Sequence, residues 1–209
     1  MNLDVEFFIK KFNVSRETIK KLNKYKDFLI DNNKLLNLIG KTTENHIFTR
    51  HFTDSAQIYD LIKDKSEIVD LGSGAGFPGV IIKILMNNNK IDGNIMLIEK
   101  SPKKCKFLQN LSEKLDLTIK IVNLRVENFK FNKISTVVSR AFKNTVDTID
   151  IIFKNNEKIR SIILIKGKTY QQELEQAKKK YTFDVEKFRS ITSNESYILK
   201  ISNIKHNTT

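Results

Sequence analysis

The stretch Glu67–Val80 reads EIVDLGSGAGFPGV, an apolar run that ends in an acid and opens into a loop with four glycines. Such a run is typical of a buried parallel strand. Glycines adopt backbone angles closed to other residues and let a ligand approach the main chain, and Pro78 suits the first turn of a helix. Strand, bare loop and helix start together predict a nucleotide-type pocket in an α/β fold.

Two cofactor classes suit this loop. The string Gly74–Gly79 matches the GxGxxG fingerprint of dinucleotide sites, which leaves a nicotinamide or flavin cofactor open. However, the match begins two residues after Gly72, and bulky Phe77 stands where a pyrophosphate needs bare backbone. Val69–Gly76 instead resembles the first motif of S-adenosylmethionine (SAM)-dependent methyltransferases, whose cofactor has no pyrophosphate. That resemblance implies cofactor contacts by Asp70, Gly72, Gly74 and Gly76.

Composition limits the class of protein. The chain has 209 residues, 40% of them hydrophobic, enough for one domain with an appendage or for two small domains. No apolar run approaches the ~20 residues that span a bilayer, and the start MNLDVEFFIKKF lacks the features of a secretion signal. One cysteine can form neither an internal disulfide nor a cysteine-based zinc site, which fits a reducing compartment. We expect a cytoplasmic protein without membrane association.

The charge points to a polyanionic partner. A formal net charge of +13 and a pI near 9.7 exceed what solubility needs. Part of this excess can reflect biased genome composition, because Lys and Asn are abundant and Trp is absent. Charge alone therefore leaves nucleic acid open as a partner without establishing it.

The first 62 residues are expected to form a helical cap on a catalytic domain of residues 63–209. Apolar residues spaced at threes and fours predict two helices between residues 6 and 37, with a boundary near Ser15. In the next predicted helix, His51 and Asp54 share a face and could bond each other. His46 and His51 are too few ligands for a metal site, so no metal is expected.

A second buried strand, Asn94–Glu99, also ends in an acid. Glu99 stands where this fold class places the carboxylate that accepts hydrogen bonds from the ribose hydroxyls; the alternative is a simple charge at a strand end. Ser101 and Pro102 start the following helix, in which Cys105 takes a core position. Lysines at this helix start suit either phosphate contact or a solvated face.

The remaining pattern completes a Rossmann-like, class I methyltransferase sheet of seven strands, mostly parallel, with a C-terminal antiparallel hairpin. After the two strands already described, the predicted strands are Thr118–Val122, Ser135–Ala141, Ser161–Lys168, Phe183–Phe188 and Ser196–Ser202, with a helix over Gln171–Lys180.

Two classes of methyl acceptor are disfavoured. Methylation of exocyclic base amines usually uses a Pro-Pro-aromatic loop, and the prolines of this chain are Pro78 and Pro102. Carbon-5 methylation of a pyrimidine needs an attacking thiolate, but Cys105 lies in a helix away from the third and fourth strand ends. An acceptor with a free lone pair remains, or a general base that the sequence does not identify.

Several motifs together resemble one family, the glucose-inhibited division protein B family of bacterial small-subunit (16S) rRNA guanine-N7 methyltransferases. The resemblance covers nearly the whole chain and departs mildly at Ile39–Gly40 and Lys103–Lys104. The motifs are NLIG at 37–40, RHFTDS at 50–55, VDLGSGAGFPG at 69–79, RVE at 125–127, SRAF at 139–142 and LIKGK at 164–168.

The resemblance implies a function and a site. Guanine N7 carries an in-plane lone pair, so methyl transfer needs positioning and no proton removal. Because the RNA major groove is deep and narrow, a loop or splayed base is the expected target. The partner would be 16S rRNA or the small subunit, and the protein a monomer. Open alternatives are another RNA acceptor, a non-catalytic rRNA-binding assembly factor and an NAD-dependent oxidoreductase.

Site residues follow from the same resemblance and from the predicted strand ends. Gly72, Phe77, Val126, Glu127 and Arg140 are expected to line the cofactor site, with Arg140 and Arg125 positioning the reactants. The expected RNA contacts are His51, Lys103, Lys104, Arg125, Lys166 and Lys168.

Overall fold

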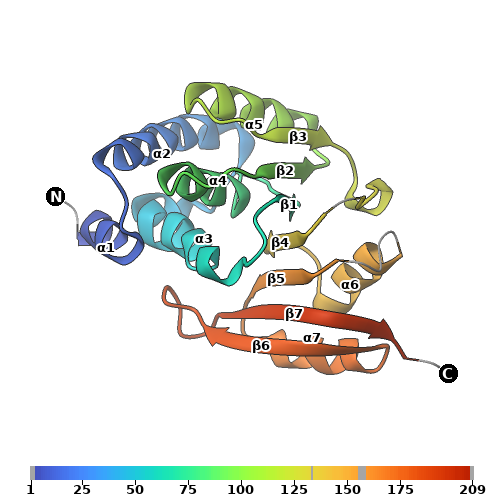
Figure 1. Ribbon diagram of the computed structural model, residues 1–209. Helices are drawn as coiled ribbons and strands as arrows, with labels where there is room; N and C mark the ends of the chain where they lie inside the picture. The colour runs from blue at the N-terminus through green and yellow to red at the C-terminus, as the bar shows by residue number, and fades with distance from the viewer. Residues whose placement is uncertain (1–2, 133, 155–158, 208–209) are drawn as a thin grey trace.

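The computed structural model describes residues 3–132, 134–154 and 159–207. Its centre is a seven-stranded sheet in the order β3-β2-β1-β4-β5-β7-β6 (Figure 1). The neighbours among β1 to β5 are parallel, and β7 runs antiparallel to both β5 and β6. This confirms the predicted fold class. The strands are β1 Glu67–Leu71, β2 Asn94–Glu99, β3 Lys120–Asn123, β4 Thr136–Arg140, β5 Ser161–Lys166, β6 Tyr181–Arg189 and β7 Tyr197–His206.

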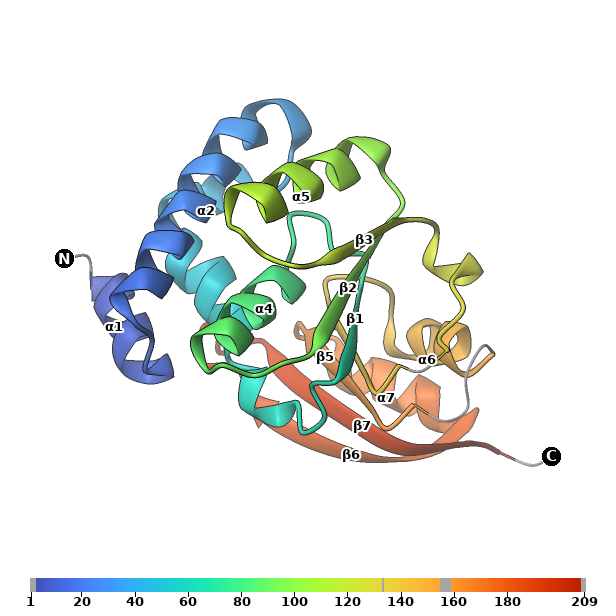
Figure 2. The ribbon, with the colours of Figure 1, turned by 45° about the horizontal axis from the view of Figure 1, so that its top comes forward.

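Helices cover both faces of the sheet (Figure 2). On one face lie α1 Leu3–Phe12, α2 Arg16–Leu36, α4 Gly79–Asn88 and α5 Pro102–Lys114; on the other lie α6 Thr145–Phe153 and α7 Tyr170–Lys178. Short helical turns complete the list: η1 Lys41–His46, η2 Phe48–Thr53, α3 Asp54–Ala56, η3 Tyr59–Leu61 and η4 Val126–Asn128.

Capping residues explain where the helices begin. The Ser15 side chain accepts a hydrogen bond from the Thr18 N–H and starts α2, and Ser101 does the same for α5 with Pro102 at its first position. Pro78 lies at the N-cap of α4, just before the first turn in which it was expected.

The N-terminal helices share a hydrophobic core with the sheet. Phe8, Leu22 and Tyr25 are fully buried in the same cluster as Ile81 of α4. Helices α2 and α5 also meet through the stacked rings of Phe28 and Phe107, 5.3 Å apart. The cap is therefore packed onto the glycine-loop side of the sheet, while the expected boundary between residues 62 and 63 stays a prediction.

Some elements differ from the sequence-based expectation. The hairpin strands are longer than expected, and α6 had not been expected at all. The continuous helix expected after Arg50 is instead the succession of η2, α3 and η3. Cys105 is buried, as predicted, and its thiol lies 3.2 Å from the carbonyl oxygen of Glu99. None of the helices in the described ranges is long and apolar enough to cross a membrane.

Candidate active site

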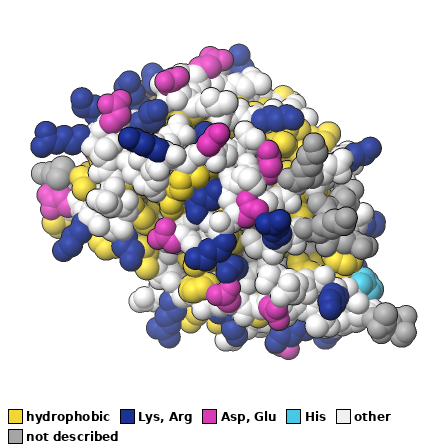
Figure 3. Space-filling model, in the orientation of Figure 1, with side chains coloured by type: hydrophobic (Ala, Val, Ile, Leu, Met, Phe, Trp, Pro, Cys, Tyr) yellow, Lys and Arg dark blue, Asp and Glu magenta, His cyan; other side chains and the backbone are white. Residues whose placement is uncertain are grey.

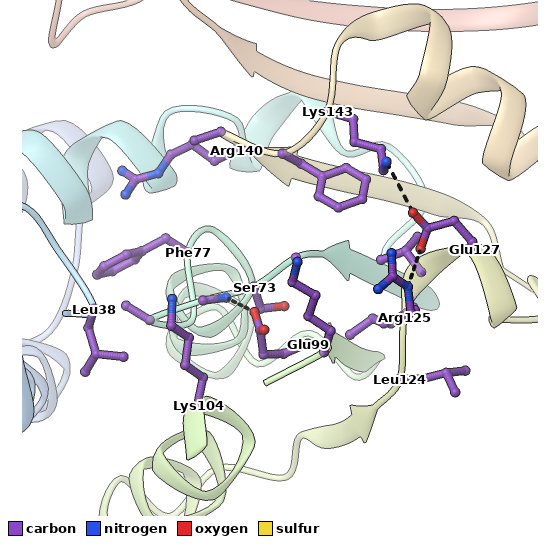
Figure 4. A pocket seen from close by; sticks show the side chains of 18 residues that line it. Leu38, Ser73, Phe77, Glu99, Lys104, Leu124, Arg125, Glu127, Arg140 and Lys143 are labelled. Carbon is purple, nitrogen blue, oxygen red and sulfur yellow. Dashed lines mark hydrogen bonds and ion pairs between the residues drawn. The ribbon is translucent and has the colours of Figure 1, made fainter. Parts of the chain in front are cut away.

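A cavity of about 510 Å³ opens at the carboxyl ends of the parallel strands (Figure 4). Open sheets of this kind bind ligands at this edge, and pockets of ~300–1,000 Å³ suit small molecules. Its walls come from the glycine loop, the end of β2, the loop after β3, the end of β4 and the cap. The lining side chains labelled in Figure 4 are Leu38, Ser73, Phe77, Glu99, Lys104, Leu124, Arg125, Glu127, Arg140 and Lys143.

Three of the four glycines of this stretch, Gly72, Gly74 and Gly76, serve different purposes. All have positive φ angles, +68° at Gly72, +56° at Gly74 and +100° at Gly76. A Cβ at Gly72 would lie 2.6 Å from the Phe142 ring, and one at Gly76 would lie 2.8 Å from the Tyr25 hydroxyl. A Cβ at Gly74 would meet nothing closer than 3.9 Å. The absence of a side chain at Gly72 and Gly76 thus makes room for Phe142 and Tyr25, whereas at Gly74 it leaves that side of the loop open.

The N–H groups of this loop are largely used inside the protein. Those of Gly72 and Ser73 donate to Ile98 O, and those of Gly76 and Phe77 donate to Ser73 O. A dinucleotide site needs such N–H groups for its pyrophosphate. The loop therefore fits a cofactor without a pyrophosphate.

Asp70 supports the loop from behind. Its side chain is fully buried, and Oδ2 accepts a hydrogen bond from the Gly79 N–H at 3.0 Å. Burial raises the pKa of Asp70 to about 7. Within the described part of the chain, Oδ1 has no hydrogen-bond partner. Asp70 is not among the side chains that line the cavity, so its predicted direct contact with the cofactor stays a prediction.

Glu99 lies in the cavity wall with its carboxylate fixed. Oε2 accepts from the Gly74 N–H at 3.0 Å and Oε1 from the Ser101 N–H at 2.8 Å, and the residue is only 7% exposed. A carboxylate oxygen has a second lone pair, so both oxygens can still accept from a ligand. This arrangement suits a pair of hydroxyls such as those of a ribose.

The far end of the cavity combines an apolar wall with charges. Leu124 and buried Val126 follow β3 and line the cavity. Glu127 forms ion pairs with Lys143 at 3.2 Å and Arg125 at 3.9 Å, which are drawn in Figure 4. The Arg125 side chain is 67% exposed and remains accessible to a large ligand.

Arg140 joins the end of β4 to the cap. Its Nη1 donates to Arg50 O and to Asp54 Oδ2, each at 3.1 Å, and its Nη2 lies 2.8 Å from His51 Nδ1. The guanidinium carbon lies 4.9 Å from the centre of the Phe77 ring. His51 and Asp54 were expected to bond each other; the structure turns both toward Arg140 instead.

His51 is enclosed by these contacts. Nε2 lies 2.8 Å from Thr43 Oγ1, the ring stacks on Phe77 at 5.1 Å, and the residue is 7% exposed. Burial, and then the nearby charges of Arg140 and Arg50, lower the pKa of His51 to about 3. The imidazole is therefore neutral at physiological pH.

The lysines predicted to contact RNA are of two kinds, those that are exposed or line the cavity and one that is already paired with an acid. Lys103 and Lys168 are exposed, and Lys104 lines the cavity from α5. Lys166 has a side chain only 10% exposed, and its ammonium lies 2.7 Å from Glu173. In Figure 3, Lys and Arg are spread over the visible face among Asp and Glu, without forming one block. Contact of these residues with RNA stays a prediction.

Several lining residues were not identified as site residues from the sequence, among them Leu38, Leu124, Phe142 and Lys143. Leu38 and Phe142 lie within the NLIG and SRAF motifs, so the motifs contained a signal for them. For Lys143 the sequence contained no such signal, because its place in the site depends on its ion pair with Glu127, which is distant in sequence. Across the described residues, no group of three or more His, Cys, Asp and Glu side chains could hold a metal ion.

Solved structures support the fold. The chain resembles M. capricolum TrmK in complex with S-adenosyl-homocysteine, with a TM-score of 0.53 and 21% identity over 74% of this chain and 69% of that chain. It also resembles the M. jannaschii tRNA m1G37 methyltransferase, with a TM-score of 0.52 and 22% identity over 74% of this chain and 49% of that chain. At these identities the likeness shows a methyltransferase fold alone.

The relatives found by sequence are more similar to this chain in sequence than these solved structures are. The family model GidB, described as rRNA small subunit methyltransferase G, matches residues 18–201. Proteins named ribosomal RNA small subunit methyltransferase G are 35% identical in Pelagibacter ubique, over 94% of both chains, and 37% identical in Rickettsia bellii, over 91% of this chain and 96% of that one. The chain therefore belongs to the GidB family, the rRNA small subunit methyltransferase G proteins.

Proposed function

We propose that this protein transfers a methyl group from SAM to N7 of a guanine in a loop of 16S rRNA of the small ribosomal subunit. Family membership supports an rRNA methyltransferase. The structural observation that carries the proposal is the fixed Glu99 carboxylate beside the open side of Gly74, in a cavity at the carboxyl edge of the sheet.

The cavity fits SAM. Glu99 would hold the ribose hydroxyls, and Leu124 and Val126 with the Phe142 ring would form an apolar site for the adenine. When bound, SAM supplies an electrophilic methyl group on its sulfonium. The residues of the chain bind and orient; the charged edge made by Arg125, Glu127 and Lys143 closes the adenine end.

The state of the titratable groups supports an acceptor that needs no deprotonation. Both nitrogens of His51 have protein partners, Asp70 lies behind the glycine loop, and Glu99 is bonded to two backbone N–H groups. None of these is placed as a free general base. Guanine N7 offers a lone pair without losing a proton, so positioning by Arg140 and Arg125 supplies the catalysis.

RNA contacts are assigned to Lys104 and Arg125, which line the cavity, and to the exposed cations Lys103 and Lys168. Each would neutralise a phosphate or donate to a guanine edge. The same prediction for Lys166 and His51 has less support, because each already binds protein groups.

The protein is inferred to act in the cytoplasm as a monomer. The thiol of Cys105 is buried and free, as in a reducing compartment. Among the described residues, Leu3 and Phe7 of α1 are exposed together, whereas the other exposed large apolar side chains, Leu35, Ile91 and Ile191, come from separate segments.

Two experiments test the proposal. Small subunits and naked 16S rRNA from a strain that lacks this enzyme are incubated with the protein and tritiated SAM. Label in the RNA supports the proposal, while RNA binding without label in either substrate would favour a passive assembly factor. Calorimetry with SAM and with NADH separates the cofactors, and binding of NADH alone would exclude the assignment.

A further inference from the structure

The strongest unassigned feature is the set of bonds by which the cap holds Arg140. Arg140 is the last residue of β4, whereas His51 and Asp54 belong to η2 and α3 of the cap. The Arg140 side chain is 17% exposed and that of Asp54 is 13% exposed, so the ion pair is well shielded from water. In Figure 4 the Arg140 side chain extends above the Phe77 ring at one end of the cavity.

The donors of Arg140 can be counted. A guanidinium carries five N–H donors and no acceptor. Nη1 uses both of its donors, on Arg50 O and Asp54 Oδ2, and Nη2 uses one on His51. Within the described part of the chain, Nε–H and the second Nη2–H have no partner. Because Arg140 lines the cavity, these two donors remain for a substrate, and their direction depends on the three bonds that hold the group.

The same bonds determine the tautomer of His51. Since Arg140 Nη2 can only donate, Nδ1 must be the acceptor, and the ring proton is on Nε2, where it donates to Thr43 Oγ1. Both nitrogens are thus in use, and the buried ring lies against Phe77. Burial of the ring, and after it the neighbouring cations Arg140 and Arg50, lower the pKa of His51 and oppose its protonation.

Asp54 connects this arrangement to the C-terminal hairpin. Its Oδ1 accepts from Thr192 Oγ1 at 2.6 Å and from Gln57 Nε2 at 2.8 Å, while Oδ2 accepts from Arg140. The side chain of Gln57 in turn accepts from the Ile191 N–H at 2.9 Å. Two remote segments, the end of β4 and the hairpin loop, therefore hold the carboxylate in one orientation together with the nearby Gln57.

We infer that His51 is a positioning residue, which fixes the orientation of the Arg140 guanidinium and acts on methyl transfer only through Arg140, without touching RNA. This rests on the proposed function. A misdirected guanidinium would place the acceptor poorly in the transition state while leaving most ground-state contacts intact. Loss of the Nδ1 acceptor should therefore lower kcat, whereas loss of an RNA contact would raise KM for the RNA.

Two matched substitutions test the roles of the two ring nitrogens of His51 separately. In His51→Asn the amide oxygen can occupy the place of Nδ1 and accept from Arg140. In His51→Gln the longer side chain reaches the place of Nε2 near Thr43 and leaves the Nδ1 position empty. Both variants lose the ring and its stacking on Phe77, so this loss is common to the pair.

The kinetics use small subunits and SAM, with melting temperatures measured for each variant. We expect His51→Gln to lower kcat by about 10-fold or more, with KM for subunits within about 3-fold of wild type, and His51→Asn to keep clearly more of the wild-type kcat. Equal losses in the two variants, or a change in KM alone, would overturn the inference. An inactive wild-type protein would instead refute the proposed function.

A measurement without cofactor or RNA tests the same assignment. ¹⁵N NMR of the free protein should show His51 neutral, with its proton on Nε2, from pH 8 down to pH 5. A ring that titrates near its ordinary pKa of about 6.5, or one protonated on Nδ1, would contradict the bond to Arg140 even if the variants were unstable.

Discussion

Replacement of Glu99 by Ala should weaken SAM binding strongly. The carboxylate is 7% exposed and already oriented by the N–H groups of Gly74 and Ser101, so a ribose would meet a preformed acceptor. Loss of a hydrogen bond to a charged group costs about 1.5–3 kcal/mol. Since 1.4 kcal/mol is a factor of ten, the Kd for SAM should rise roughly 10- to 150-fold.

The substitution also affects the fold to a limited extent. It leaves the two backbone N–H groups without their carboxylate, which costs about 1–3 kcal/mol if water does not replace it. For a chain of this length, each 1 kcal/mol lowers the melting temperature by about 2–4 °C. The binding assay should therefore be run well below the melting temperature of the variant.

Isothermal titration calorimetry with SAM and with its demethylated product measures the effect. Glu99→Gln keeps one acceptor oxygen and should fall between wild type and Glu99→Ala. Glu113→Ala, an exposed acid of α5 away from the cavity, is the control and should bind like wild type. An unchanged Kd in a folded Glu99→Ala variant would refute the reasoning and leave Glu99 as a charge at a strand end.

Three further predictions concern stability and RNA binding. Tyr25→Phe removes the hydroxyl that donates to Ala75 O at 2.6 Å, and should lower the melting temperature by about 2–12 °C through a loss of about 1–3 kcal/mol; an unchanged value would show that the bond contributes nothing. The pKa of Asp70, about 7 in the folded protein against an ordinary 3.8, means that stability falls as the pH rises through this window. The Asp70→Asn variant cannot ionise at this position. Between pH 4 and pH 7 its free energy of unfolding, measured with urea, should therefore fall by roughly 2–4 kcal/mol less than that of the wild type. Parallel pH dependences of the two proteins would contradict the raised pKa of Asp70. Lys166→Ala should lower the melting temperature by breaking a shielded ion pair, whereas Lys168→Ala should leave it unchanged and reduce the log-log salt slope of RNA binding by about 0.7; the reverse pattern would exchange their roles.

Much of the fold could be predicted because its signals are local. Buried parallel strands such as Asn94–Glu99 are apolar runs with clear ends, and Ser101 with Pro102 marks a helix start in the sequence itself. Helix α6 was absent from the expectation although Asn144 caps it and apolar residues recur along it. Helix α6 follows the loop after β4, and the apolar pattern of the strands does not define how long that loop is.

The site was less predictable where it depends on distant partners. Periodicity placed His51 and Asp54 on one face of a helix, but the group that binds both, Arg140, comes from the end of β4. Lys166 illustrates the same limit, because a cation at the end of a strand gives no sign that it will form an ion pair with Glu173. The glycine loop and Glu99 were found because each stands at the end of a buried apolar strand, and such strand ends are visible in the sequence itself.

The most direct test of the central claim identifies the atom that receives the methyl group. Small subunits lacking the modification are incubated with the protein and SAM that carries a deuterated methyl group, and the nucleosides of the 16S rRNA are then separated and measured by mass spectrometry. We predict deuterated 7-methylguanosine as the labelled product. Label in any other nucleoside, or no label although SAM binds, would contradict it.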